Sequence, residues 1–139
     1  MAAAGFRLVM VTNQPDIARG RVGSDEVARQ NSAVQCELGL DDVRMCPHDD
    51  ADRCACRKPA AGMLLDAARD AGIDLAASIM VGDRWRDIEA GRGAGTRTVF
   101  IDHGYGERRA DGADLVVRSL PEAVPYILGL LDGDCDADR

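Results

Sequence analysis

Short apolar runs alternate with longer amphipathic stretches along the chain, and polar or turn-forming residues separate them. The apolar runs are typical of buried parallel strands, because both faces of such strands are covered. Strands are expected at residues 6–12, 42–46, 79–81, 98–101 and 115–117. Helices are expected over about 25–38, 61–71, 84–93 and 119–131. This alternation of strands and helices predicts an α/β fold with a parallel sheet.

Local signals set the ends and faces of the first two helices. Ser24 is a candidate N-cap of the first helix, and Gly39 is a candidate C-terminal stop. The second helix is expected to bury a face that contains Leu64, Leu65 and Ala68.

Composition narrows the class of protein. A chain of 139 residues has the size of one domain, and 46% apolar residues suffice for a packed core. The net charge of −7 argues against nucleic-acid and membrane-surface partners, which call for a basic face. No apolar run approaches the roughly 20 residues of a membrane span, and no secretory signal pattern is evident. The cytoplasm is therefore the expected location, whereas the oligomeric state is not readable from the sequence.

The chain has five cysteines, an odd number that argues against a disulfide framework. Three of them and one histidine lie within eleven residues, as Cys46, His48, Cys54 and Cys56. Three thiolates and one imidazole form a closed tetrahedral zinc site of the structural kind. The loop between them is polar, and bound zinc would give it a defined shape. The alternative is an exposed loop with unrelated thiols, and the close grouping of four ligands favours zinc.

Polar side chains follow the first expected strand. In parallel α/β sheets, ligands bind beyond the carboxyl ends of the strands. Thr12 and Asn13 come at such an end, and both side chains can donate hydrogen bonds to a phosphate oxygen. Thr-Asn is also a common dipeptide where a strand passes into a turn, so this signal alone is weak.

Two basic residues follow the cysteines and histidine. Lys58 lies between Arg57 and Pro59, so its backbone is restrained on both sides. A lysine held in this way can neutralise charge on a transferring phosphoryl group. The planar fork of Arg57 could bind a second anionic group. The alternative is a solvated basic pair without a function.

An acidic residue follows the third expected strand. Asp83 comes directly after a buried run and is well placed to bind Mg²⁺, which prefers oxygen ligands. Asp87 falls in the first turn of the next helix, where it is either a ligand, a brace behind Asp83 or a favourable N-terminal charge. His103 and Tyr105 follow a later strand, and no pattern assigns them a role.

Together these motifs resemble the haloacid-dehalogenase (HAD) superfamily. The resemblance covers residues 6–131 and rests on three segments in the same order and spacing: Thr12-Asn13-Gln14, the stretch from Cys46 to Pro59, and Val81-Gly82-Asp83 with Asp87. The subgroup that it most resembles contains heptose bisphosphate and histidinol-phosphate phosphatases. It implies a three-layer Rossmann-like fold and Mg²⁺-dependent hydrolysis of a small phosphorylated metabolite, first of all a heptose bisphosphate.

The resemblance also implies a role for each matching residue. Thr12 would hold the phosphoryl group, and Lys58 would stabilise it during transfer. The side chains that would contact the substrate beside them are Asn13, Gln14, Pro15, Arg57 and Arg84. Asp83 would bind Mg²⁺, with Asp87 behind it. The structural zinc ligands would be Cys46, His48, Cys54 and Cys56.

One family motif has no counterpart in this chain. Asp-x-Asp-Gly-Thr carries the nucleophile, the general acid and one Mg²⁺ carboxylate, and in the family it lies on a central strand upstream of the Thr-Asn motif. Eleven residues precede Thr12, and none of them is acidic. The strands with Thr12 and Asp83 are therefore expected to lack a neighbour on one edge.

The start of the chain, Met1–Gly5, reads as the last turn of a helix. The expectation is an N-terminally truncated HAD-like domain over 1–131, with a zinc loop at 46–56 and an acidic tail at 132–139. Such a chain alone is expected to be inactive. The alternative is a non-catalytic or partner-dependent module that is stabilised by zinc and binds phosphosugars.

Overall fold

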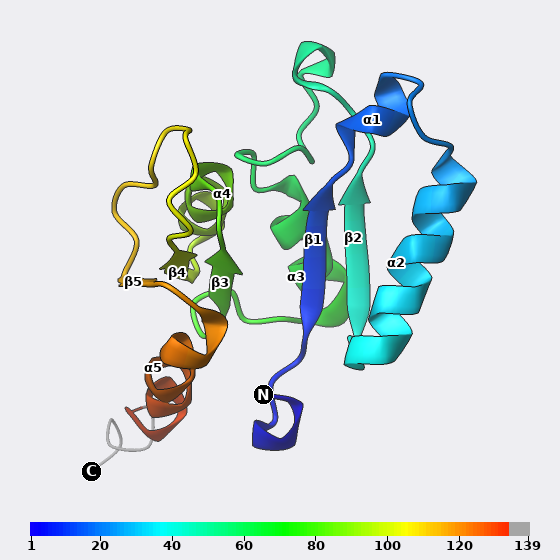
Figure 1. Ribbon diagram of the computed structural model, residues 1–139. Helices are drawn as coiled ribbons and strands as arrows, with labels where there is room; N and C mark the ends of the chain where they lie inside the picture. The colour runs from blue at the N-terminus through cyan, green and yellow to red at the C-terminus, as the bar shows by residue number, and fades with distance from the viewer. Residues whose placement is uncertain (134–139) are drawn as a thin grey trace. The chain divides into compact units, whose positions relative to one another are not determined.

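A computed structural model of the chain describes residues 1–133 (Figure 1). The described chain forms two compact units, of which the first is Met1–Ile73 and the second begins at Asp74. Each unit has its own parallel sheet with helices beside it, so the predicted α/β class is confirmed. No helix within 1–133 is both long and apolar enough to cross a membrane.

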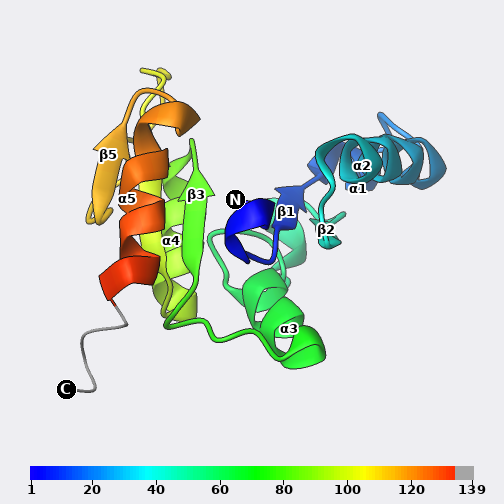
Figure 2. The same cartoon turned by 90° about the horizontal axis from the view of Figure 1, so that it is seen from below.

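The first unit is built around a two-stranded sheet. Its elements are η1 (Ala2–Ala4), β1 (Val9–Asn13), α1 (Pro15–Ala18), α2 (Ser24–Leu38), β2 (Asp42–Cys46), η2 (Asp50–Asp52) and α3 (Gly62–Ala71). Strands β1 and β2 pair in parallel, from Val9 opposite Asp42 to Asn13 opposite Cys46. Helices α2 and α3 lie on opposite faces of this sheet (Figure 2). The carboxyl ends of both strands therefore meet at one edge, where α1 and the loop after β2 begin.

The second unit contains a three-stranded parallel sheet in the order β3-β4-β5. Its elements are β3 (Ile79–Gly82), α4 (Trp85–Ala94), β4 (Arg97–Ile101), β5 (Leu115–Val117) and α5 (Leu120–Gly133). Helix α4 approaches β3 closely, because a Cβ atom at Gly91 would lie 2.6 Å from the Cβ of Met80. Glycine in a helix costs about 0.5–1 kcal/mol relative to alanine, and the close packing explains its presence here.

Strands β1 and β3 each have a single strand neighbour among the described residues, β2 and β4 respectively. This arrangement agrees with the expectation that both strands would lack a neighbour on one edge. Both predicted chemical motifs, Thr12-Asn13 and Asp83, lie at the carboxyl ends of these two edge strands.

The first strand and the first helix differ from their predicted boundaries. β1 begins at Val9, because the N–H of Leu8 donates to the Asp41 carboxylate (2.7 Å) instead of a neighbouring strand. Ser24 is the first residue of α2 and not its N-cap; Gly23 takes the cap position, without a side-chain hydrogen bond. The predicted stop is confirmed, since Gly39 has φ 62°.

The buried face of α3 also differs from the prediction. Met63, Leu64 and Ala67 are buried, whereas Leu65 is 47% exposed. Adjacent helical residues point about 100° apart, so a stripe centred on Leu64 and Ala67 turns Leu65 towards solvent.

The two ends of the chain were also predicted from the sequence. The first residues form one 3-10 turn that ends at Gly5 in the left-handed region (φ 86°), as the helical reading of Met1–Gly5 predicts. The final helix reaches Gly133, so the predicted acidic tail at 132–139 lies mostly outside the described residues.

Candidate functional site

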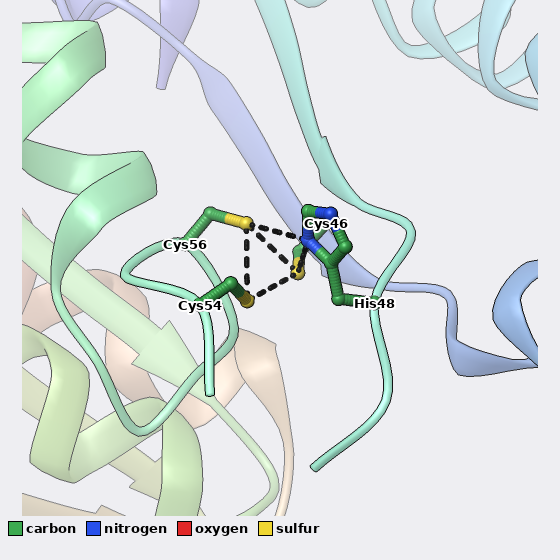
Figure 3. Close-up of side chains that lie close together, drawn as sticks. All are labelled: Cys46, His48, Cys54 and Cys56. Carbon is green, nitrogen blue, oxygen red and sulfur yellow. Dashed lines mark hydrogen bonds between the residues drawn. The ribbon is translucent and has the colours of Figure 1, made fainter. Parts of the chain in front are cut away.

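The four predicted zinc ligands lie together in the first unit (Figure 3). Cys46 is the last residue of β2 and is fully buried, and the other ligands come from the loop that follows it. Their ligand atoms all lie within 4.8 Å of one another. The Sγ of Cys56 is 3.0 Å from that of Cys46 and 3.4 Å from that of Cys54. His48 Nδ1 completes the group, 3.3 Å from the Sγ of Cys56.

This donor set suits zinc. Tetrahedral Zn–S bonds of about 2.3 Å place sulfur atoms roughly 3.8 Å apart. The sulfur atoms here lie 3.0, 3.4 and 3.6 Å apart, so a small outward shift would accommodate the ion. Three sulfurs and one nitrogen fill all four positions and leave none for a substrate, so the site would be structural.

The crowding of the thiols also favours a cation. Burial and the contact with the Cys46 thiol raise the pKa of Cys56 to about 12. Burial acts in the same direction on Cys54, but hydrogen bonds from the Arg57 N–H and the neighbouring thiols outweigh it and lower its pKa to about 7. Three thiols at such distances cannot all ionise without a positive partner, because each thiolate opposes the next.

The loop is tied to α1 by an exposed ion pair. Arg19 donates two hydrogen bonds to Asp49, at 2.7 and 2.9 Å, and lowers the pKa of this carboxyl to about 2. Asp49 in turn caps η2 by accepting from the N–H of Asp50. At the end of the loop, a Cβ atom at Gly62 would lie 2.2 Å from the carbonyl oxygen of Ala55, so the backbone path there requires glycine.

Arg57 is part of this loop structure. Its side chain is 11% exposed, and its Nε donates to Asp50 at 2.7 Å. A second nitrogen donates to the carbonyl of His48 at 3.3 Å. The structure thus gives Arg57 a bracing role within the loop, and its predicted contact with a substrate stays a prediction.

Lys58 is fixed against the end of β1. The Asn13 side chain pairs with the backbone of Lys58 through two hydrogen bonds of 3.1 Å, one in each direction. The ammonium of Lys58 donates to the carbonyl of Val11 at 2.9 Å, and the residue is only 9% exposed. The structure therefore brings together the two motifs that the sequence separates by 45 residues.

Thr12, Gln14 and Pro15 complete this edge of the first unit. The Gln14 side chain donates to the Thr12 hydroxyl at 3.2 Å, and the Gln14 N–H donates to the carbonyl of Cys46 at 2.8 Å. Pro15 opens α1, where its missing N–H costs nothing. Both strand ends, the loop ligands and Lys58 thus form one connected polar edge.

In the second unit, Asp83 follows β3 as predicted and accepts a hydrogen bond from the Tyr105 hydroxyl at 2.9 Å. That hydrogen bond raises the pKa of the phenol, which keeps the hydroxyl protonated as a donor. The guanidinium of Arg84 lies 4.1 Å from the centre of the Tyr105 ring and pairs with Glu107 at 3.0 Å. Sequence patterns did not single out Tyr105, because its contact with Asp83 joins two loops.

Asp87 braces the turn that carries Asp83. Its carboxylate accepts the backbone N–H of Arg84 at 3.1 Å and is 6% exposed. A Cβ atom at Gly82 would lie 2.2 Å from the Cβ of Asp87, so glycine lets the side chain pack against the end of β3. This geometry supports the bracing interpretation of Asp87, one of the three that the sequence left open.

Comparisons with known proteins agree with these features. A family model described as "HAD-hyrolase-like" matches residues 55–123. A D-glycero-beta-D-manno-heptose-1,7-bisphosphate 7-phosphatase from Haemophilus ducreyi is 37% identical, over 88% of this chain and 76% of that protein. The corresponding protein of Pasteurella multocida is 35% identical, over 94% of this chain and 78% of its own length.

Solved structures give the same result. The D,D-heptose 1,7-bisphosphate phosphatase from B. bronchiseptica, crystallised with magnesium and phosphate, superposes with a TM-score of 0.80. It is 31% identical, and the match covers 92% of this chain and 77% of that one. The chain therefore belongs to the haloacid-dehalogenase superfamily, within the family of the heptose bisphosphate 7-phosphatases.

Proposed function

We propose that the protein functions in the Mg²⁺-dependent hydrolysis of a phosphomonoester of a small sugar. Heptose 1,7-bisphosphate is the first candidate substrate. The names of the relatives support this substrate, and the crystallised relative that was solved with magnesium and phosphate supports the metal. In this proposal the chain binds the phosphoryl group with Thr12 and Lys58, beside Asn13 and Gln14.

The observation that carries the proposal is the fixed position of Lys58. The two hydrogen bonds with Asn13 hold the backbone of Lys58, and the hydrogen bond to the Val11 carbonyl holds its ammonium near the end of β1, one residue before Thr12 in the chain. A charge that is already oriented and partly shielded from water stabilises a transferring phosphoryl group without reorganisation. A hydroxyl donor and an ammonium at one strand end also match the donors that phosphate oxygens require.

Asp83 is the residue of this chain that would hold Mg²⁺. Its carboxylate lies in the turn after β3, half-buried, with Asp87 bracing the backbone behind it. Carboxylate oxygen is the ligand that Mg²⁺ prefers, and the bound ion would supply positive charge that a phosphoryl group can bind. Tyr105 orients the carboxylate by donating to one of its two oxygens.

The cluster of Cys46, His48, Cys54 and Cys56 would hold zinc in a structural role. The same loop continues directly into Arg57 and Lys58, and the Arg57 N–H donates to the Sγ of Cys54 at 3.4 Å. Zinc would therefore position Lys58 through the backbone.

A second candidate function is binding without turnover. The sequence contains no Asp-x-Asp-Gly-Thr motif, which provides the attacking carboxylate and the general acid in the family. We therefore expect the 139-residue chain by itself to bind the phosphosugar and to leave it intact. Hydrolysis would require that motif from another segment or a partner chain.

The test combines binding and turnover. Calorimetry with heptose 1,7-bisphosphate and Mg²⁺ measures binding to the chain, and phosphate release measures hydrolysis. Binding without release supports the proposal, and release should appear when a segment with Asp-x-Asp-Gly-Thr is fused to the chain. Absence of binding would refute the assigned phosphoryl site, and turnover by the chain alone would show that another of its carboxylates attacks phosphorus.

A further inference from the structure

A cavity of about 210 Å³ lies entirely within the second unit, beside Asp83. Its walls come from the ends of β3 and β4 and from the loop after β4, which rises beyond the tip of the β3 arrow in Figure 1. Drug-sized ligands occupy pockets of about 300 Å³ or more, so this volume suits a group the size of one sugar ring. Apart from the hydrogen bond from Tyr105 to Asp83, the loop that forms it, residues 102–114, has no part in the phosphate or zinc chemistry described above.

The charges around the cavity are already paired. Arg109 pairs with Asp102 at 2.8 Å, Arg84 pairs with Glu107 at 3.0 Å, and Arg108 pairs with Glu89 at 2.6 Å. Because each guanidinium faces a carboxylate of the chain, the cavity has little net attraction for a second phosphate.

The polar groups of the lining are suited to hydroxyls. The paired carboxylates of Asp102 and Glu107 keep further lone pairs that can accept hydrogen bonds, and the imidazole of His103 can donate or accept. Phe100, 4% exposed, contributes an apolar wall. A polyol has alternating hydroxyls and C–H faces, and such a lining complements both.

Tyr105 gives the cavity a fixed aromatic wall. The Arg84 guanidinium lies 4.1 Å from the centre of the Tyr105 ring, and the Tyr105 hydroxyl donates a hydrogen bond to Asp83. The centre of the His103 ring lies 5.6 Å from that of the Tyr105 ring. A ring fixed on two sides can receive the apolar face of a sugar without losing further conformational freedom. Because Tyr105 is hydrogen-bonded to Asp83, this aromatic wall adjoins the proposed Mg²⁺ position.

We propose that this cavity is the subsite for the sugar moiety of the phosphorylated substrate, with His103 and Tyr105 as the residues that contact it. The inference rests on the proposed function, since Mg²⁺ on Asp83 would bind an oxygen of the substrate phosphate, and Asp83 itself lines the cavity. The paired arginines further indicate that the cavity selects neutral hydroxyls and not a second phosphate.

The test compares two probes in the presence of Mg²⁺: heptose 1,7-bisphosphate and inorganic phosphate. Amide NMR spectra of the 139-residue chain report which residues each probe shifts, and titrations give the two dissociation constants. His103→Ala and Tyr105→Phe alter the cavity at exposed positions, and Arg118→Ala is the matched control, exposed in the same unit but outside the cavity.

The two probes are expected to affect the cavity differently. The bisphosphate should shift amides of residues 103–109, whereas inorganic phosphate should leave them in place. His103→Ala should weaken the bisphosphate about tenfold and change the affinity for phosphate less than about twofold. Tyr105→Phe should weaken the bisphosphate by a smaller factor, because the ring remains.

Two results would overturn the inference, and they are distinguishable. If both probes bind and shift only the segments around Thr12 and Lys58, with both variants unchanged, the cavity has no part in recognition while the phosphoryl site stands. If neither probe binds the wild-type chain, both the cavity proposal and the proposed function fail.

Discussion

Two polar loops of this molecule follow the carboxyl ends of parallel strands, and they are held in opposite ways. The loop at 46–59 closes around four ligand atoms, one of them the sulfur of fully buried Cys46. The loop at 102–114 is held by exposed ion pairs, in which the side chains of Arg108 and Arg109 are 56% and 68% exposed. The first fixes Lys58, and the second surrounds the proposed sugar cavity.

This difference suggests a division of tasks. A closed ligand set is cooperative, because losing one ligand disrupts the whole site. Exposed ion pairs contribute at most about 1 kcal/mol each and act almost independently, so the loop that they hold can adjust to a ligand. We therefore expect the loop that would contact the phosphoryl group to be more rigid than the loop that would surround the sugar.

Removing zinc should have the largest effect. Cys46→Ser deletes a buried ligand, and structural zinc sites contribute on the order of 10 kcal/mol in small domains. We expect loss of bound zinc and unfolding of the first unit. Metal analysis and thermal denaturation measure the two effects.

The matched control for this change is Cys36→Ser, at an exposed cysteine of α2 outside the cluster. If Cys46→Ser keeps one zinc per chain and an unchanged melting temperature, the contrast between the two loops is wrong. The first loop would then be held by its hydrogen bonds without a complete ligand set.

Replacing Lys58 should affect phosphate binding more than stability. Lys58→Met keeps most of the side-chain length but removes the charge that is held at the Val11 carbonyl, and we expect at least about a tenfold loss of phosphate affinity. Calorimetry with phosphate and Mg²⁺ measures it. Lys58 is the only lysine of the chain, so protection of its amine from acylation by bound phosphate provides an independent check.

The control is Arg69→Met, which removes a positive charge from an α3 side chain that is 70% exposed. Equal losses in both variants would mean that net charge, and not the fixed ammonium, governs binding.

A smaller effect is expected where the loop at 102–114 enters β5. The Asp114 carboxylate accepts from the backbone N–H of Thr98 at 2.7 Å and from its hydroxyl at 2.9 Å. These hydrogen bonds lower the pKa of Asp114 below its ordinary value. Because Asp114 is exposed and asparagine keeps one acceptor oxygen, Asp114→Asn should cost only about 0.5–1 kcal/mol in the free energy of unfolding, measured by urea denaturation at neutral pH.

The sign of the pH dependence follows from the lowered pKa. The contribution of Asp114 is fully present above its unfolded pKa of about 3.9, and it is lost as the pH falls through the lower folded value. The stability difference between wild type and Asp114→Asn should therefore shrink below about pH 4. Asp111→Asn serves as the control, and a similar loss there would show a general effect of charge.

Salt should produce the smallest effect and should act on one loop only. Raising the salt from about 0.05 to 0.5 M screens exposed ion pairs, each worth less than about 1 kcal/mol. Trp85, the only tryptophan, lies 4.6 Å from the Arg108 guanidinium and reports on this loop. Its quenching by acrylamide should increase with salt, and Glu89→Gln should reproduce part of the increase.

The zinc content of the first unit should not change over the same range of salt. A salt-dependent loss of zinc would contradict the comparison, since it would show that metal binding depends on exposed ion pairs such as Arg19–Asp49 and not on the four ligands alone.

Several features were predictable because their signal is local. The ligand group from Cys46 to Cys56 spans eleven residues, so its types and spacing already indicated a metal site. The strand at Asp42–Cys46 and the stop at Gly39 also matched, because a short apolar run and a glycine in the left-handed region depend on near neighbours.

Two other predictions were wrong because they depend on contacts with distant segments. The exposure of Leu65 depends on which part of α3 meets the sheet, and the start of β1 depends on where β2 begins to pair. Neither partner is visible in the apolar pattern of the segment itself.

By itself the sequence determined the class of fold, the family motifs and the kinds of side chain available for chemistry. Only the tertiary structure decided which of them meet. Lys58 reaches Val11 across 47 residues, and Tyr105 reaches Asp83 across 22. Such contacts depend on how strands and loops pack, because hydrophobic burial fixes the framework first and polar groups then bond to whatever lies within reach.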